Sequence, residues 1–177
     1  MVTGRHGDAQ FTGEEKNVAT DYFLKLDGID GESTDDKHKG EIDVLSWSWG
    51  VSQSGTHQAG GGGGAGKASP TDLSFSMITC KASPKLYLAC ATGEHIKTAK
   101  LVVRKAGGEQ QEYMSVLLSD VLVSSYSTGG SGGGDLPMES FSLNFGKMEY
   151  EYKPQKADGT LDSPVKTGYD YKLNKKV

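Results

Sequence analysis

The chain has 177 residues, about the size of one ordinary domain, and it is poor in hydrophobic residues. Hydrophobic residues make up 35% and 25 residues are glycine, about twice the usual share, which favours turn-rich β structure over a helical enzyme. The net charge of −4 leaves no basic surplus for a phosphate backbone and argues against a nucleic-acid partner. No apolar run approaches the roughly 20 residues of a membrane span or the apolar core of a signal peptide. We therefore expect synthesis in the cytoplasm and no membrane partner.

Periodic strand patterns begin only after a polar segment. Residues 1–19 lack periodicity, and residues 21–27 then alternate with period two. We accordingly divide the chain into a flexible extension, 1–20, and one β domain, 21–177. A charged run, 32–39, follows the first strand and is typical of a solvated loop.

The segment 41–52 carries two faces of opposite character, as expected of a strand with one dry and one wet side. Its large apolar residues alternate with small ones, and Ile42 and Val44 are one step out of phase, which indicates a bulge near position 44. The apolar face comprises Leu45, Trp47, Trp49 and Val51, and the small face comprises Ser46, Ser48, Gly50 and Ser52. We predict that Trp47 and Trp49 are core residues.

Residues 53–69 contain no apolar side chain larger than alanine and are predicted to form a long flexible loop. Loops of this length in compact domains usually serve binding. Residues 61–67 match most of a phosphate-binding loop, with four residues between Gly61 and Gly66 and then Lys67. Position 68 is alanine instead of a hydroxyl residue, and a strand pattern follows where a helix is required. The flexible-loop interpretation is therefore preferred to nucleotide binding.

The rest of the chain predicts further strands and one helix. The helix has Ser83 as N-cap, Pro84 at its first position and Gly93 as its stop. Glycine- and aspartate-rich turns separate strands at 73–77, 99–104, 112–124, 140–152 and 168–173. The fold class is mainly β: an antiparallel two-sheet β-barrel or sandwich with one short α-helix.

No pattern of catalytic, cofactor-binding or metal-ligating residues emerges. His6, His38, His57 and His95 are widely separated and are expected to be exposed loop residues. Cys80 and Cys90 lack metal spacing; a disulfide between them is the alternative, and two reduced, half-buried thiols are the preferred expectation. Glu149 and Glu151 have the spacing of a carboxylate pair, but such a pair is more often the wet face of a sheet, and we prefer that interpretation.

Tyr169 and Tyr171 leave open a monomeric carbohydrate-binding sandwich as the alternative function. Aromatic residues at period two are more often part of a core or a subunit contact.

Several long segments closely resemble the Hcp (haemolysin-coregulated protein) family, the tube proteins of the bacterial type VI secretion system. The resemblance runs from residue 21 to about residue 173, and two segments that carry it are DYFLKLD at 21–27 and EIDVLSWSWGVSQSG at 41–55. Further matching segments are the glycine-rich 60–67, DLSF at 72–75, RKAGG at 104–108, VLVSS at 121–125, STGGSGG at 127–133 and YKPQKADG at 152–159.

The resemblance implies a non-enzymatic subunit of a homohexameric ring that stacks into tubes. Rings of this family lie inside a contractile sheath, carry a spike protein at the tip and are secreted with effectors, some held in the lumen. No cofactor is implied. Export would require no cleaved signal peptide, and the extension before residue 21 departs from the family pattern.

The resemblance also gives specific residues a role. Ser48 is the candidate for the lumen wall and effector contact. The loop after it is expected to contact a neighbouring subunit or ring, and its candidate residues are Gln53, Gly55, His57, Gly61, Gly64 and Lys67.

Overall fold

The computed structural model describes residues 19–55, 65–107, 110–133 and 136–177. Within these ranges the chain forms eleven strands and one helix. The first strands are β1 (Thr20–Leu26), β2 (Ile42–Val44), β3 (Ser46–Ser48), β4 (Val51–Gly55), β5 (Ala65–Pro70) and β6 (Leu73–Ile78). Helix α1 (Ser83–Thr92) is followed by β7 (His95–Lys105), β8 (Glu112–Gly129), β9 (Met138–Tyr152), β10 (Val165–Asp170) and β11 (Lys175–Lys176). The mainly β, antiparallel prediction with one short helix is confirmed.

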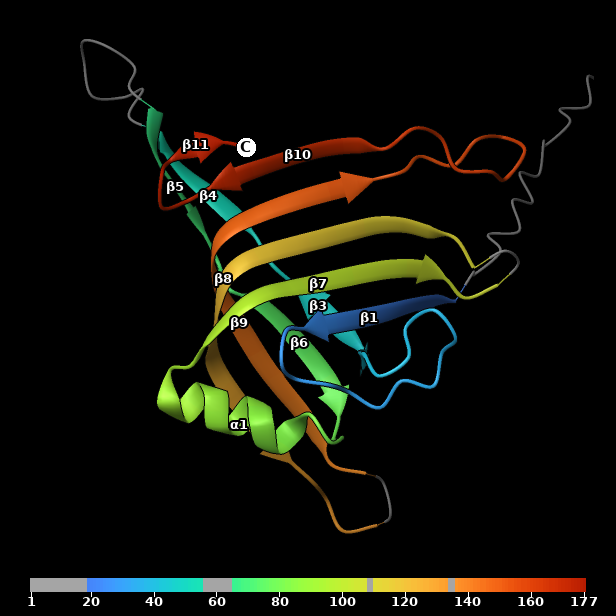
Figure 1. The fold of residues 1–177 in the computed structure, drawn as a ribbon, viewed down its shortest axis with the longest axis vertical. Coiled ribbons are helices and arrows are strands. Elements are labelled where there is room, and N and C mark those ends of the chain that lie inside the picture. The colour runs from blue at the N-terminus through green and yellow to red at the C-terminus, as the bar shows by residue number, and fades with distance from the viewer. Residues whose placement is uncertain (1–18, 56–64, 108–109, 134–135) are drawn as a thin grey trace, which may run out of the picture.

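The strands form two layers that share the long strands β8 and β9 (Figure 1). The first layer has the order β11-β10-β9-β8-β7-β1-β2, and the second joins β3 to β6 and β6 to the first half of β9. The sheet order does not close on itself, so the sandwich half of the prediction fits and the closed barrel does not.

The chain passes from one layer to the other at Leu45. Val44 pairs with β1, whereas Ser46 already pairs with β6, and the Leu45 N–H donates to Ser76 O at 2.8 Å. The expected irregularity near position 44 is therefore a strand that changes its partner. Ile42 and Val44 are buried, while Leu45 is exposed.

Apolar side chains from both layers fill the space between them. The fully buried ones include Leu24, Ile42, Leu73, Met77, Leu101, Leu118, Phe141 and Leu143. On β2 and β6 buried and solvent-facing residues alternate, as expected of strands with one face in the core. On β1 and β7 the alternation is broken, because Phe23 and Val102 are buried beside Leu24 and Leu101.

Helix α1 ends as predicted but begins differently. Gly93 adopts a left-handed φ of 69°, and its N–H bonds to Ala89 O, which closes the helix. The N-cap is Ala82, and the predicted N-cap Ser83 is the first residue of the helix. Its hydroxyl does not cap a backbone N–H but donates to the buried carboxylate of Glu139 at 2.6 Å. No helix in the described ranges is long and apolar enough to cross a membrane.

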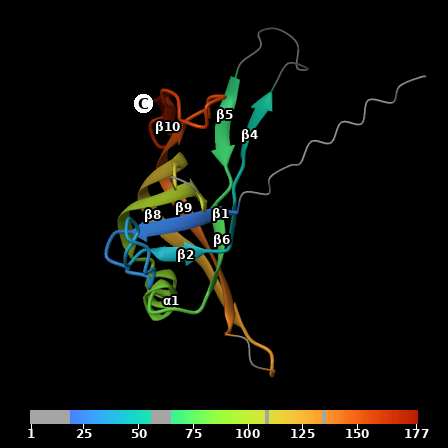
Figure 2. The same ribbon diagram turned by 90° about the vertical axis from the view of Figure 1, so that its right-hand side faces the viewer.

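Strands β4 and β5 form a separate two-stranded ribbon, which we call the arm. Figures 1 and 2 both show the arm projecting from one end of the sandwich, at the end opposite to the turn between β8 and β9. The predicted loop 53–69 is thus wrong for residues 53–55 and 65–69, which are paired strands. The ladder joins Val51 to Pro70 and Gln53 to Ala68, pairings that local propensity does not reveal.

Candidate functional site

Two rows of serines cross the second layer on the face that points away from the core. One row runs through Ser46, Ser76, Ser140 and Ser127, which are direct cross-strand neighbours on β3, β6, β9 and β8. The other runs through Ser48, Ser74, Ser142 and Ser125 on the same four strands. We call these eight residues the serine face.

The serine hydroxyls bond to one another and form a continuous polar surface. Ser46 and Ser76 Oγ are 2.6 Å apart, and Ser127 and Ser140 Oγ are 2.9 Å apart. In the second row Ser74 and Ser142 Oγ are 2.9 Å apart. Because serine is small and its hydroxyl both donates and accepts, this surface is smooth, uncharged and able to exchange hydrogen bonds with a passing polar surface.

The opposite side of the same four strands is apolar. Phe75 and Phe141 stack at 5.1 Å between ring centroids, and both are buried. Trp47 pairs with Phe75 in the ladder and makes an edge contact with Tyr22 at 6.4 Å. The buried aromatic residues fix the orientation of each strand, so the intervening serines must point outward.

Trp47 and Trp49, predicted as core residues, are partly buried and pack against the edge of the core. Leu45 and Val51, expected on the same apolar face, are both exposed. The prediction of one continuous apolar face over residues 45–51 is therefore wrong, because the strand changes partner at Leu45.

A small polar cluster continues the serine face toward the arm. Asp72 accepts hydrogen bonds from Ser124 Oγ at 2.5 Å and from Asn144 Nδ2 at 2.8 Å. Ser124 is the extra residue of a bulge in β8, where the register with β9 shifts between Val123 and Ser125. Bulges re-aim side chains, and this one directs a hydroxyl to the carboxylate.

Ser48 is exposed and belongs to the serine face. Ser46 was placed with it on the predicted small-residue face, but the six serines on β6, β8 and β9 were not singled out from the sequence. Their alternation with apolar residues in SFS, SSYS and SFSL was a usable signal, but only the register aligns them.

The candidate contact residues fall on the arm or beyond it. Gln53 and Gly55 lie in β4, and Lys67 lies in β5 with an exposed side chain. His57, Gly61 and Gly64 lie outside the described residues. Lys67 is followed by more strand instead of a helix, which removes the context that a phosphate-binding loop needs.

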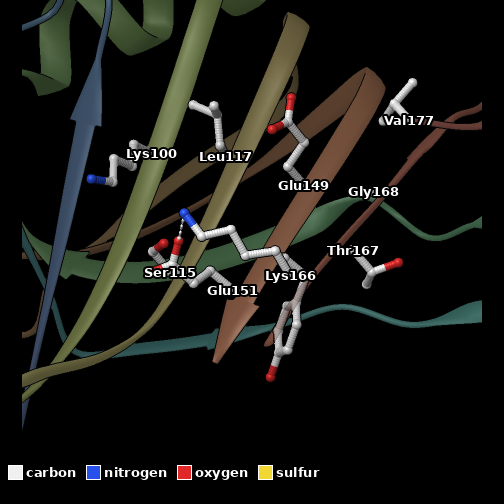
Figure 3. A pocket seen from close by; sticks show the side chains of 10 residues that line it. Lys100, Ser115, Leu117, Glu149, Glu151, Lys166, Thr167, Gly168 and Val177 are labelled. Carbon is white, nitrogen blue, oxygen red and sulfur yellow. Dashed lines mark ion pairs between the residues drawn. The ribbon is translucent and has the colours of Figure 1, made fainter. Parts of the chain in front are cut away.

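The carboxylate pair lies on the outer face of the first layer, beside a shallow pocket of about 300 Å³ (Figure 3). Glu149 pairs with Lys147 at 2.7 Å and Glu151 with Lys166 at 2.5 Å, the latter drawn as a dashed line in Figure 3. The hydrogen bond from Lys166 lowers the pKa of Glu151. Both carboxylates thus have cationic partners, as on a wet sheet face.

The remaining candidates occupy structural positions. Tyr171 packs against Phe145 and the core, and Tyr169 donates to Asn174 at 2.8 Å, so the two tyrosines do not form an open platform. Cys80 and Cys90 are unpaired and half-buried, and burial raises the pKa of Cys80. No group of three or more potential metal ligands occurs in the described ranges.

The prediction that the histidines are exposed loop residues is wrong for His38, which is buried, and wrong in part for His95, which begins strand β7. His38 is buried, stacks on Phe23 at 4.1 Å and lies 2.9 Å from Glu41 through Nδ1, whereas His95 is exposed near Asp120. His6 and His57 lie outside the described residues.

A family model described as "Type VI secretion system effector, Hcp" matches residues 23–152. The chain belongs to the Hcp family. It is 53% identical over 159 residues to Protein hcp1 of Pseudomonas aeruginosa, covering 89% of this chain and 98% of that protein. The crystal structure of Hcp1 from Salmonella typhimurium is 43% identical, with a TM-score of 0.75, covering 90% of this chain and 99% of that one.

A second Hcp-type structure extends this agreement. A structure described as a type six secretion system protein is 34% identical to this chain, with a TM-score of 0.84. The match covers 90% of this chain and 100% of that one. The Hcp chain is therefore a structural tube protein of the type VI secretion system. These likenesses favour the tube-protein prediction over a carbohydrate-binding module.

Proposed function

We propose that this Hcp chain assembles head-to-tail into six-membered rings whose lumen is lined by the serine face. The observation that carries the proposal is the pair of open edges of the second layer. In the described ladders β3 pairs only with β6, and the last residues of β8, 125–129, pair only with β9. Such open edges are templates for strand pairing with another chain.

The strand directions allow the two edges to meet. Each neighbouring pair in the order β3-β6-β9-β8 is antiparallel, so β3 and β8 run in opposite directions. The end of β8 in one copy can therefore pair antiparallel with β3 of the next. Because the two edges are different surfaces, the interface is heterologous and closes into a ring when the rotation per copy fits.

A ring closed in this way places the serine face inside and the core outside it. The lumen then offers uncharged hydroxyls to a transported effector, without apolar residues in its middle to hold the effector tightly. We propose that stacked rings form the tube that carries effectors within the contractile sheath, with a spike protein at the tip. The role is structural and non-catalytic, and secretion proceeds without a cleaved signal peptide.

The ring is tested by size-exclusion chromatography with multi-angle light scattering. We expect a particle of about six times the 18.8 kDa monomer mass. Head-to-tail pairing through β-strand edges gives a closed assembly, so the mass should not drift upward at moderate concentration. A monomer at all concentrations would contradict the proposed function.

The lumen assignment is tested by filling the serine face. Ser48→Trp and Ser140→Trp should leave the ring mass unchanged and reduce capture of co-expressed type VI effectors about tenfold, because a bulky side chain narrows the lumen and replaces a hydroxyl. The matched control is Thr167→Trp, an exposed position on β10 in the other layer. Undiminished capture by both serine variants would refute the lumen assignment.

A further inference from the structure

The serine face ends in a carboxylate on the side of the arm. Asp72 lies between β5 and β6, where the arm meets the second layer. It accepts hydrogen bonds from Asn144 Nδ2 on β9 at 2.8 Å and from Ser124 Oγ in the bulge of β8 at 2.5 Å. Asn144 points to the same side of the layer as Ser142, because the residue between them, Leu143, is buried. The carboxylate is therefore held on the same side as the serine rows.

Asp72 is the one charged side chain on this side of the layer among the residues that the structure describes. The strand segments that build the face contain one other charged residue, Glu139, and it is buried on the core side. These segments are 46–48, 73–78, 122–129 and 138–145.

The negative charge of Asp72 has no cationic partner within the described part of the chain. Both of its hydrogen-bond donors are neutral, and none of the ion pairs found there includes it. On the outer face of the first layer, by contrast, Glu149 and Glu151 each have a lysine partner. Asp72 is thus fixed in position but not neutralised.

The proposed ring multiplies this charge. Because all copies are equivalent by symmetry, six Asp72 carboxylates lie at one level of the lumen, near the mouth from which the arms project. A cleft lined by charge of one sign focuses its field into the enclosed space and raises the local concentration of opposite charge. The serine rows beyond this level add hydrogen-bond donors and acceptors but no charge. Such a lumen favours a cargo surface that is cationic and polar.

We infer that Asp72 and the serine face select effectors by charge and hold a segment rich in lysine or arginine at the arm end of the lumen. The inference rests on the proposed function, because only a closed ring gathers the six carboxylates. It goes further by naming the chemical class of the cargo, a basic and hydroxyl-bonding protein segment. The retention is electrostatic, so it weakens as the salt concentration rises.

Labelled peptides test the charge selection on purified rings of confirmed mass. We would follow the fluorescence anisotropy of fluorescein-labelled hexa-arginine, hexa-glutamate and hexa-serine. Hexa-arginine should bind about tenfold more tightly than either other peptide at about 50 mM salt, and several-fold more weakly at about 500 mM, because salt screens the carboxylates. Equal affinity for the three peptides would overturn the inference.

Charge variants locate the binding site. Asp72→Asn should weaken hexa-arginine binding about tenfold. Asp72→Lys should instead bind hexa-glutamate, a gain that a folding defect cannot produce. The matched control is Asp43→Asn, an exposed acid on β2 in the first layer, which removes the same charge from each copy and should leave peptide binding unchanged.

The outcomes separate this inference from the ring itself. Hexa-arginine binding that persists in Asp72→Asn would place the peptide elsewhere on this acidic protein, or would mean that a neighbouring copy already neutralises Asp72, for example through Lys67 of its arm. Either result overturns the inference and leaves the ring intact. If the Asp72 variants form no rings, the comparison of hexa-arginine with hexa-glutamate on wild-type rings decides. A monomer in light scattering would overturn both the inference and the proposed function.

Discussion

Arg104 is the most deeply buried charged residue at the outer face of the first layer, only 2% exposed. Its guanidinium donates two hydrogen bonds to Asp35, at 2.9 and 2.7 Å, and one to Asp21 at 2.8 Å, and it lies 4.7 Å from the Phe23 ring centroid. These bonds tie the loop between β1 and β2 to strands β1 and β7. The Arg104 hydrogen bond lowers the pKa of Asp35 to about 2.

Replacing Asp35 with asparagine should therefore destabilise the protein in a pH-dependent way. At pH 7 we expect a loss of about 2 kcal/mol, because the folded carboxyl has a lower pKa than the unfolded one. The stabilisation is complete above the unfolded pKa near 4 and disappears as pH falls through the folded value of about 2. Urea unfolding of Asp35→Asn and wild type at pH 7 and pH 3 should show the difference shrinking.

The matched control for this prediction is Asp36→Asn, whose exposed side chain adjoins Asp35 in sequence. It should change stability by less than about 0.5 kcal/mol. A difference between Asp35→Asn and wild type that stays constant down to pH 3 would exclude the depressed pKa as its cause.

At the scale of the elements, the sequence predicted those that local patterns control. The strand over 21–27 and the helix stop at Gly93 follow from residues within a few positions of each other. The arm was missed because pairing of Val51 with Pro70 stabilises glycine- and serine-rich strands that have little propensity of their own. The partner change at Leu45 likewise depends on strand β6, about 30 residues away.

The candidate site was predicted only in part for the same reason. Ser48 stood out beside two tryptophans, but a serine row across four strands exists only through register. Ser46 and Ser127, at the two ends of one row, are 81 residues apart in the sequence. No local sequence pattern could have predicted that Ser46 and Ser127 lie in the same row of the sheet.

Helix α1 depends on one buried carboxylate for its attachment to the sheet. Glu139 is 4% exposed and accepts hydrogen bonds from Ser83 Oγ and Thr79 Oγ1, at 2.6 and 3.0 Å. It also raises the pKa of Tyr126, which burial and this carboxylate together bring to about 12. One residue on β9 thus holds the helix start, the preceding turn and β8.

Replacing Glu139 with leucine should loosen this end of the helix. We expect a loss of about 1–3 kcal/mol, since Ser83 loses its acceptor and Thr79 keeps only Pro137 O. Amide hydrogen exchange in α1 should accelerate more than in β1 or β7. The control is Glu94→Leu, an exposed acid after the helix, and equal exchange in the two variants would contradict the anchoring role.

At the scale of the whole molecule, only 35% of the residues are hydrophobic, and yet several large apolar side chains are exposed at the edges of the domain. The exposed large ones include Val51, Ile78, Leu136, Met138, Val165 and Leu173. A domain of this size buries about two thirds of its surface alone. In the proposed ring and stack, neighbouring copies cover part of the remainder, so assembly contributes to the stability of each subunit.

This coupling makes the thermal stability depend on protein concentration. For a ring of six that unfolds to monomers, each tenfold dilution lowers the unfolding free energy by about 1 kcal/mol per subunit. The melting temperature should therefore fall by about 2–4 °C per tenfold dilution. Differential scanning fluorimetry over a hundredfold concentration range measures the shift. A melting temperature that is constant over that range would mean that the subunits unfold independently, and that ring contacts contribute nothing to folding.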